Sequence, residues 1–186
     1  MMMARPKGNG AEVGKRLVAA AGRGFRTGGF GGIGVDALAG EAGLTSGAFY
    51  AHFGSKAVAF REAVRDGLQF TLASIQQFQE NHGPEWQQHF ARFYLGERMD
   101  ADLPDACIFQ TLTPDIARSD LETRQVYSGL LSEIISSLAH GFDGDRDRAW
   151  AFWSLLTGAG AMTRATTDAK AREEALQAVL KAALKV

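Results

Sequence analysis

The segment from Gly34 to Phe53 holds the residues whose types and spacing could do recognisable chemistry. Two short runs with helical spacing of apolar residues, 35–42 and 45–52, are separated by Gly43. Glycine suits a tight turn between helices, because it accepts a positive φ without a Cβ clash. The second run exposes small, polar or ring-bearing side chains, which can enter a major groove and contact base edges or phosphates. These residues are Thr45, Ser46, Gly47, Ala48, Tyr50 and His52.

The elements around this segment must hold it in place. Four apolar side chains can close a small core beneath the two short helices, and an earlier helix with an apolar stripe can complete a three-helix module. A glycine-rich break, 28–32, ends that first helix, and Gly22 and Gly24 lie inside it at a cost of about 1 kcal/mol each relative to alanine. The core residues are Leu38, Leu44, Phe49 and Phe53, and the stripe is Val13, Leu17, Ala21 and Phe25.

Together these features resemble the DNA-binding module of the TetR (tetracycline repressor-like) family, over roughly residues 13–65 of the chain. One departure from the family pattern is Gly34, where threonine or serine often caps the second helix. The matching residues are Ala20-Ala21, Phe25, Gly28-Gly29-Phe30, Leu38-Ala39, Ala42-Gly43, Thr45-Ser46-Gly47, Tyr50-Ala51-His52-Phe53 and Lys56.

The resemblance implies a role for each matching polar position. Residues 45–48 are expected to face bases or backbone, and Tyr50 to contact phosphates, as is His52 unless it reaches a base edge. Lys56 is expected to pair with a phosphate, and the basic arm, Arg5 and Lys7, to reach the duplex. The plain alternative for Tyr50 and His52 is ordinary surface exposure.

The rest of the chain is also helical in pattern, so the sequence predicts an all-α protein of about nine helices without a convincing strand. We expect a DNA-binding helix-turn-helix domain over 1–56 and an effector-binding and dimerisation domain over 57–186. A long helix from Lys56 to about Gln79 should join them. Further helices are expected over Asp102–Thr113, after a Ser119 cap, over Asp145–Thr166 and over Asp168–Leu184.

Charge is distributed unevenly between these two parts. Residues 1–56 contain seven basic and three acidic residues, a net +4, whereas the remainder contains 13 basic and 18 acidic residues, a net −5. A basic N-terminal part suits a phosphate partner, because cationic side chains displace condensed counterions. A chance asymmetry of a solvated surface would give the same totals.

Aromatic residues concentrate in the second part, where an apolar pocket for a small hydrophobic effector is expected. Ordinary core packing is the alternative for each of them. Cys107 is either an electrophile or oxidant sensor or a buried, inert thiol. The candidate ligand-binding residues are Trp86, Phe90, Phe93, Cys107, Tyr127, Trp150 and Trp153.

By resemblance, the partners are double-stranded operator DNA, a small-molecule effector and a second copy of the chain, which docks through the last two helices. Small residues at 158–161 and an apolar face of Leu176, Val179, Leu180 and Leu184 suit such docking, although in a monomer they could pack inward. The resemblance implies a repressor that the effector releases from a palindromic operator.

Other function classes find little support. The four histidines, His52, His82, His89 and His140, lack metal-ligand spacing, and neither a Gly-x-Ser-x-Gly elbow nor a phosphate loop is present. We therefore expect no enzymatic activity, no metal and no cofactor. Without a signal-peptide or membrane-span pattern, and with a single cysteine, a cytoplasmic location is expected. A helical adaptor with a vestigial N-terminal motif remains a competing interpretation.

Overall fold

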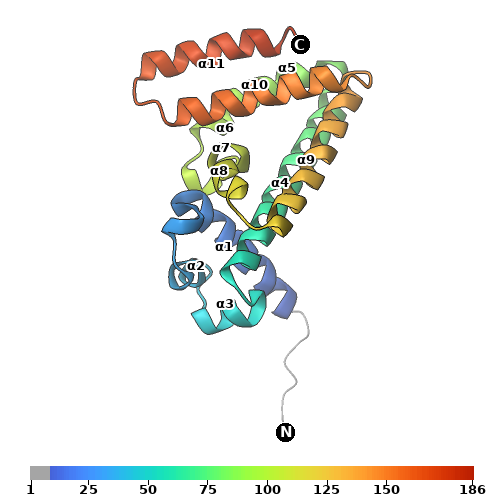
Figure 1. Ribbon diagram of the computed structural model, residues 1–186. Helices are drawn as coiled ribbons and strands as arrows, with labels where there is room; N and C mark the ends of the chain where they lie inside the picture. The colour runs from blue at the N-terminus through green and yellow to red at the C-terminus, as the bar shows by residue number, and fades with distance from the viewer. Residues whose placement is uncertain (1–8) are drawn as a thin grey trace.

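The computed structural model describes residues 9–186, which form helices joined by turns, with no strand among them (Figure 1). The expected arm residues Arg5 and Lys7 lie outside the described residues. Within 9–186, no helix combines the length and the apolar character that a membrane crossing requires. The prediction of an all-α fold is confirmed.

Three helices form the N-terminal unit: α1 (Asn9–Gly32), α2 (Val35–Glu41) and α3 (Ser46–Phe53). The first is longer than its glycine content suggests. It continues through Gly28 and bends at Gly29, whose φ of 67° and ψ of 173° are not helical, before a last short turn. The glycine-rich stretch therefore produces a kink in α1 rather than a separate loop.

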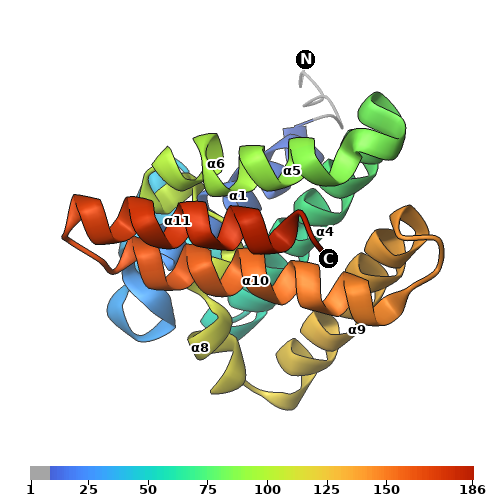
Figure 2. The same ribbon diagram turned by 90° about the horizontal axis from the view of Figure 1, so that it is seen from above.

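The long helix α4 (Lys56–His82) leads into the C-terminal part, and α9 (Leu121–Gly141) runs beside it in the same direction (Figure 1). Seen from above, α5 (Trp86–Leu95), α10 (Arg146–Arg164) and α11 (Ala169–Ala183) lie across the end of that pair (Figure 2). Short pieces connect these layers: η1 (Gly83–Glu85), α6 (Glu97–Asp100), η2 (Leu103–Asp105), α7 (Ile108–Thr111) and α8 (Thr113–Ala117).

Side chains that accept hydrogen bonds from the first turn fix where most of the longer helices begin. Ser55 caps α4, Asp145 caps α10 and Asp168 caps α11, and both aspartates are the residues at which the sequence predicts these helices to begin. The expected Ser119 cap is wrong: Asp120 caps α9, and its carboxylate accepts from the Thr123 amide at 2.7 Å. An aspartate at this position has both the acceptor and the charge that a helix N-terminus favours.

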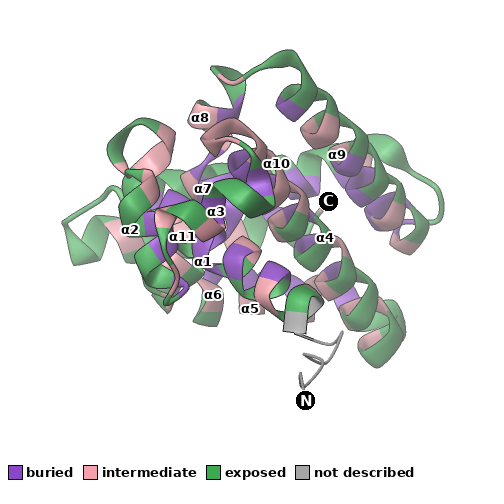
Figure 3. Ribbon diagram, turned by 90° about the horizontal axis from the view of Figure 1, so that it is seen from below, coloured by how far each residue is buried: buried purple, intermediate pink, exposed green. Residues whose placement is uncertain are grey.

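The core is continuous from the N-terminal unit to the far helices, and buried faces turn inward throughout (Figure 3). Phe25 and Phe60 meet edge to face, with ring centroids 5.0 Å apart, where α1 crosses α4. Further along, Phe90 and Phe152 belong to an aromatic cluster among α5, α10 and the end of α9. The N-terminal unit is thus packed directly on the long helix that carries it.

Candidate nucleic-acid interface

The two short helices α2 and α3 are held by the small core that the sequence predicts. Leu38, Phe49 and Phe53 are buried, and Leu44 is half-buried against them. The turn between the helices uses Gly43 at a φ of 67°, as expected. Arg16 of α1 fastens this turn, because its guanidinium donates to the Ala42 carbonyl at 2.9 Å.

Gly24 explains how closely α1 and α2 approach each other. A Cβ at this position would lie 2.6 Å from Leu38 Cδ2 and 2.8 Å from Ile33 Cδ1. No sequence pattern accounts for a glycine here, and the structure supplies the reason. The missing side chain lets Leu38 pack against the backbone of α1, which fixes the base on which α3 rests.

The outward side of α3 lies at the end of the molecule opposite α10 and α11 (Figure 1). Gly47, Tyr50 and Ala51 are exposed, and Tyr50 retains 52% of its accessible surface. Small residues let a groove approach the helix, and a phenol can donate to a phosphate oxygen. This side has the shape and chemistry expected of a recognition surface.

Two hydroxyls at the start of α3 already have internal partners. Thr45 caps the helix, since its Oγ1 accepts from the Ala48 amide at 3.3 Å, and the Ser46 hydroxyl donates to the Asp36 carboxylate on α2. From the sequence, both residues are expected to contact DNA, and the sequence pattern indicates no structural role for either of them. In the structure they first fix α3 relative to α2, and any contact with DNA would be added to that role.

His52 is exposed but lies against α1. A Cβ at Gly14 would come within 2.8 Å of His52 Cε1, and the imidazole meets Phe53 edge to face at 4.6 Å. The ring is therefore placed by its packing on α1. Gly14 makes this packing possible, and no spacing pattern in the sequence connects the two residues.

Lys56 stands at the first position of α4, directly after the Ser55 cap. Its Nζ lies 4.9 Å from the centroid of the Phe30 ring, a cation–π contact that holds the ammonium near the helix N-terminus. Lys56 and the amides of the first turn thus lie at the same end of α4. That combination favours an anion such as a phosphate.

Ionic and hydrogen-bonded contacts join this unit to the C-terminal part. Arg23 pairs with Asp105 at 2.5 Å, and Arg26 Nε donates to the Pro104 carbonyl at 2.6 Å. On α4, Arg61 contacts the carboxylates of Asp120 and Glu122, at 3.3 and 2.5 Å. The attachment of α1 to η2, and of α4 to α9, is therefore polar as well as apolar.

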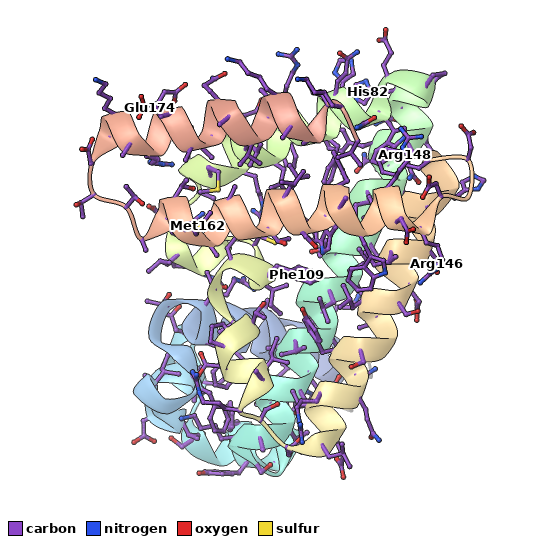
Figure 4. The ribbon with its side chains drawn as sticks, turned by 45° about the horizontal axis from the view of Figure 1, so that its top comes forward. His82, Phe109, Arg146, Arg148, Met162 and Glu174 are labelled. Atoms are coloured by element: carbon purple, nitrogen blue, oxygen red, sulfur yellow. The ribbon has the colours of Figure 1, made fainter. Side chains whose placement is uncertain are left out.

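The expected effector-binding residues do not gather around one cavity. Trp86, Phe90 and Trp153 are buried in the aromatic cluster, and Phe93 and Tyr127 are half-buried. Phe109, which was not among them, lies in the interior against Trp153, with ring centroids 5.0 Å apart (Figure 4).

Cys107 and Trp150 have different surroundings from the packed rings. Cys107 is only 3% exposed and accepts a hydrogen bond from the Tyr94 hydroxyl at 3.2 Å. Burial raises the pKa of Tyr94 well above its ordinary value, so the phenol stays protonated as the donor. Trp150 instead lies on the outer side of α10 and is 41% exposed.

Two cavities lie where the N-terminal unit meets the C-terminal part. One, of about 500 Å³, is lined by residues of α1, α4, α6, η2 and the start of α7, including Arg26, Phe70 and Arg98. The other, of about 400 Å³, lies between Phe30 and Phe60 on one side and Asp120 on the other. Neither was expected from the sequence, because their residues come from separate stretches and share no spacing pattern.

The outer side of α10 is exposed and built of small residues with two large apolar ones. A Cβ added at Gly158 would meet no atom within 4 Å, and Met162 is 65% exposed. On α11, by contrast, Leu176, Val179 and Leu180 pack against the core. The small exposed residues of α10 are Ala151, Ser154, Gly158 and Ala161.

Comparison with known proteins gives one sequence match and several structural ones. Residues 17–63 match the family described as bacterial regulatory proteins, tetR family. No curated protein matches the chain.

The structural matches extend over nearly the whole chain. The reduced form of NemR from E. coli has a TM-score of 0.80 at 15% identity, over 94% of this chain and 96% of that one. A TetR-family regulator from Mesorhizobium loti has a TM-score of 0.71 at 19% identity, over 94% and 96%. EbrR, described as a multidrug binding protein complexed with proflavin, has a TM-score of 0.60 at 21% identity, over 91% and 98%. These similarities establish the fold.

Proposed function

We propose that the chain, whose residues 17–63 match the tetR family of bacterial regulatory proteins, is a dimeric repressor whose α3 helices dock on a palindromic operator and which a small effector releases. The family is described as bacterial regulatory proteins, and we infer from this that the chain binds DNA, regulates transcription and is not an enzyme. Repression, the palindrome and release by a ligand are the steps that we add.

The exposed side of α3 carries this proposal. Tyr50 projects from a helix whose other outward residues are small, and Lys56 lies at the amino end of the next helix. A helix of this kind can enter the major groove while the phenol and the ammonium contact the flanking phosphates. The internal bonds of Thr45 and Ser46 support the docking by keeping α3 at a fixed angle to α2.

The outer side of α10 supports dimerisation through the last two helices. A stripe of small residues lets two helices approach closely, and exposed apolar side chains such as Trp150 and Met162 gain from being covered. We expect α11 to contribute to the dimer interface through its exposed end near Leu184, because its main apolar face packs against the core of its own chain. A two-fold axis there would present both α3 helices to one side of a duplex.

The cavities at the junction support control by a small molecule. They touch α1 and α4, the helices that carry the DNA-binding unit, so an occupant can change how that unit is held. EbrR, a protein of this fold, is complexed with the small molecule proflavin. The cluster that contains Trp86, Phe90 and Trp153 is a second, apolar candidate region for a hydrophobic effector.

A mobility-shift assay on the DNA upstream of the protein's own gene tests the proposal. The wild type and the double variant Tyr50→Ala/Lys56→Ala are compared at moderate salt, with excess nonspecific DNA. A matched control is Lys170→Ala, which removes the same charge from the exposed start of α11. We expect the wild type and the control to shift a discrete fragment and the double variant to lose it. Equal shifts by all three proteins would contradict the proposal.

A further inference from the structure

The cavity of about 500 Å³ at the junction combines basic groups with apolar surface. Arg26 enters it from α1 and Arg98 from α6, while Gly67 and Phe70 line it from α4 and Ile108 from α7. A cavity of this volume falls within the range of pockets that hold drug-sized ligands. Its walls come from both the DNA-binding unit and the C-terminal part.

Neither arginine of the cavity has an ion-pair partner among the described residues. One carboxylate of the cavity, Asp105, is already bound to Arg23 at 2.5 Å, and Arg26 makes its hydrogen bond to the neutral Pro104 carbonyl. Asp66 also lines the cavity, but within the described part of the chain it forms no ion pair with either arginine. The cavity thus holds two guanidinium groups whose charge the protein leaves without a direct counterion.

The two arginines also act unfavourably on each other. Burial lowers the pKa of Arg26, and the neighbouring charge of Arg98 lowers it further, whereas Asp105 and Asp66 oppose this effect. A partly buried cation beside a like charge is relieved when an anion enters between them. Guanidinium groups bind carboxylate and sulfonate oxygens through paired donors.

An exposed aromatic ring forms part of the apolar wall of the cavity. Phe70 is 61% exposed, and its ring lies 5.8 Å from the guanidinium carbon of Arg98. Gly67 lets Ile108 pack closely against the backbone of α4, since a Cβ there would come within 3.1 Å of Ile108 Cδ1. A ring or short chain that entered here would cover Phe70 while its anionic end met the arginines.

We propose that this cavity is the effector site and that the effector is an amphipathic anion, with a carboxylate or similar oxyanion between Arg26 and Arg98 and an apolar body against Phe70. Its role in regulation rests on the proposed function. The anion would bridge Arg26 of α1 and Arg98 of α6 and would compete with the Pro104 carbonyl for Arg26. The contact between η2 and the DNA-binding unit would therefore change.

Binding of the fluorescent probe 8-anilinonaphthalene-1-sulfonate to the purified full-length protein tests the site without DNA. Its neutral relative N-phenyl-1-naphthylamine lacks the sulfonate and separates charge recognition from apolar binding. The variant is Arg98→Gln, and the control is Arg124→Gln, which makes the same charge change at an exposed position of α9. A Phe70→Ser variant tests the apolar wall, and thermal unfolding verifies that each variant folds.

We expect Arg98→Gln to lower the affinity for the anionic probe by about tenfold and to leave the affinity for the neutral probe nearly unchanged. Phe70→Ser should lower the affinity for both probes, whereas Arg124→Gln should change the affinity for neither. Equal binding of the anionic probe to the wild type and Arg98→Gln would overturn the site. So would a loss that is the same for both probes.

A second measurement tests the link to regulation. Saturating anionic probe should lower operator affinity of the wild type and not of Arg98→Gln. Probe binding with unchanged operator affinity would overturn the regulatory role while leaving the proposed function intact. A wild type that binds the probe but no operator would instead point to failure of the proposed function.

Discussion

At the scale of single residues, the absence of a Cβ at Gly24 is required for the close packing of α1 against α2. A Cβ there would overlap Leu38 and Ile33, whereas a Cβ at Gly129, inside α9, meets nothing within 4 Å. We predict that Gly24→Ala lowers the free energy of unfolding by about 1–3 kcal/mol, because overpacking forces the two helices apart. Gly129→Ala should raise it by about 0.5–1 kcal/mol through helix propensity. Urea denaturation of both variants measures the difference, and a Gly24→Ala as stable as the wild type would refute the packing explanation.

The Cys107 thiol is the second residue with a direct test. Because it is buried and bonded to Tyr94, we predict slow reaction with an aromatic disulfide reagent in the native protein. One equivalent should react promptly after denaturation in urea, as the internal control. Rapid stoichiometric labelling of the native protein would show that the thiol is accessible and would revive the sensor interpretation.

Residue types alone predict part of the geometry of the candidate interface. The exposure of Tyr50 and the burial of Phe49 follow from helical spacing, because opposite sides of one helix are visible in a sequence. The contact of His52 with Gly14 and the hydrogen bond from Ser46 to Asp36 were not visible. Both join residues of different helices, and their partners depend on how those helices cross.

At the scale of elements, the cap of α9 gives a pH-dependent prediction. The Thr123 amide, and then the charge of Arg61, hold the pKa of Asp120 below its ordinary value. Such a group stabilises the fold above its unfolded pKa of about 3.9, and this contribution is lost as the pH falls through the lower folded value.

We predict that Asp120→Ala lowers the free energy of unfolding by about 1 kcal/mol at pH 7 through loss of the cap. Asp120→Asn should cost less, since asparagine also caps helices. The gap between the wild type and Asp120→Asn should shrink as the pH falls below about 4. Thermal unfolding at several pH values measures it, and a gap that widened in acid would contradict the assignment.

Long helices were predicted well and short ones poorly. The stripe from Phe60 to Phe78 locates α4 without ambiguity, because many turns repeat one pattern. The single helix expected over Asp102–Thr113 is instead divided into η2 and α7, and α8 begins at Thr113. Pro104 and Pro114 are tolerated in the first turn of a helix but not in its interior, so each of them begins a new helical segment. Which segments form then depends on packing against α1 and α10.

At the scale of the whole molecule, the outer side of α10 sets the expected assembly. We predict that Gly158→Glu converts the dimer to a monomer, because it places a charge where two helices would meet. The matched control is Ser128→Glu on the exposed side of α9. Light scattering after size-exclusion chromatography gives the masses. A dimer that survives Gly158→Glu would place the interface elsewhere.

The sequence predicts a DNA-binding unit and an effector-binding part, because the helix-turn-helix segment and the long helix each have their own pattern. The cavities did not follow. Their walls combine Arg26, Phe70 and Arg98, which only the crossing of α1, α4 and α6 brings together. A binding site made by a crossing of helices has no signature in any one segment.

Selection of bound fragments from sheared genomic DNA tests the central claim, that α3 reads an operator, most directly. The wild type and a Gly47→Glu variant are compared at moderate salt, since Gly47 is exposed on α3 and a carboxylate there would repel phosphates. We predict that the wild type enriches a small set of fragments sharing an inverted repeat, with half-site centres about one helical turn apart. The variant should enrich none of them. No enrichment by the wild type, or the same fragments recovered by both proteins, would contradict the claim.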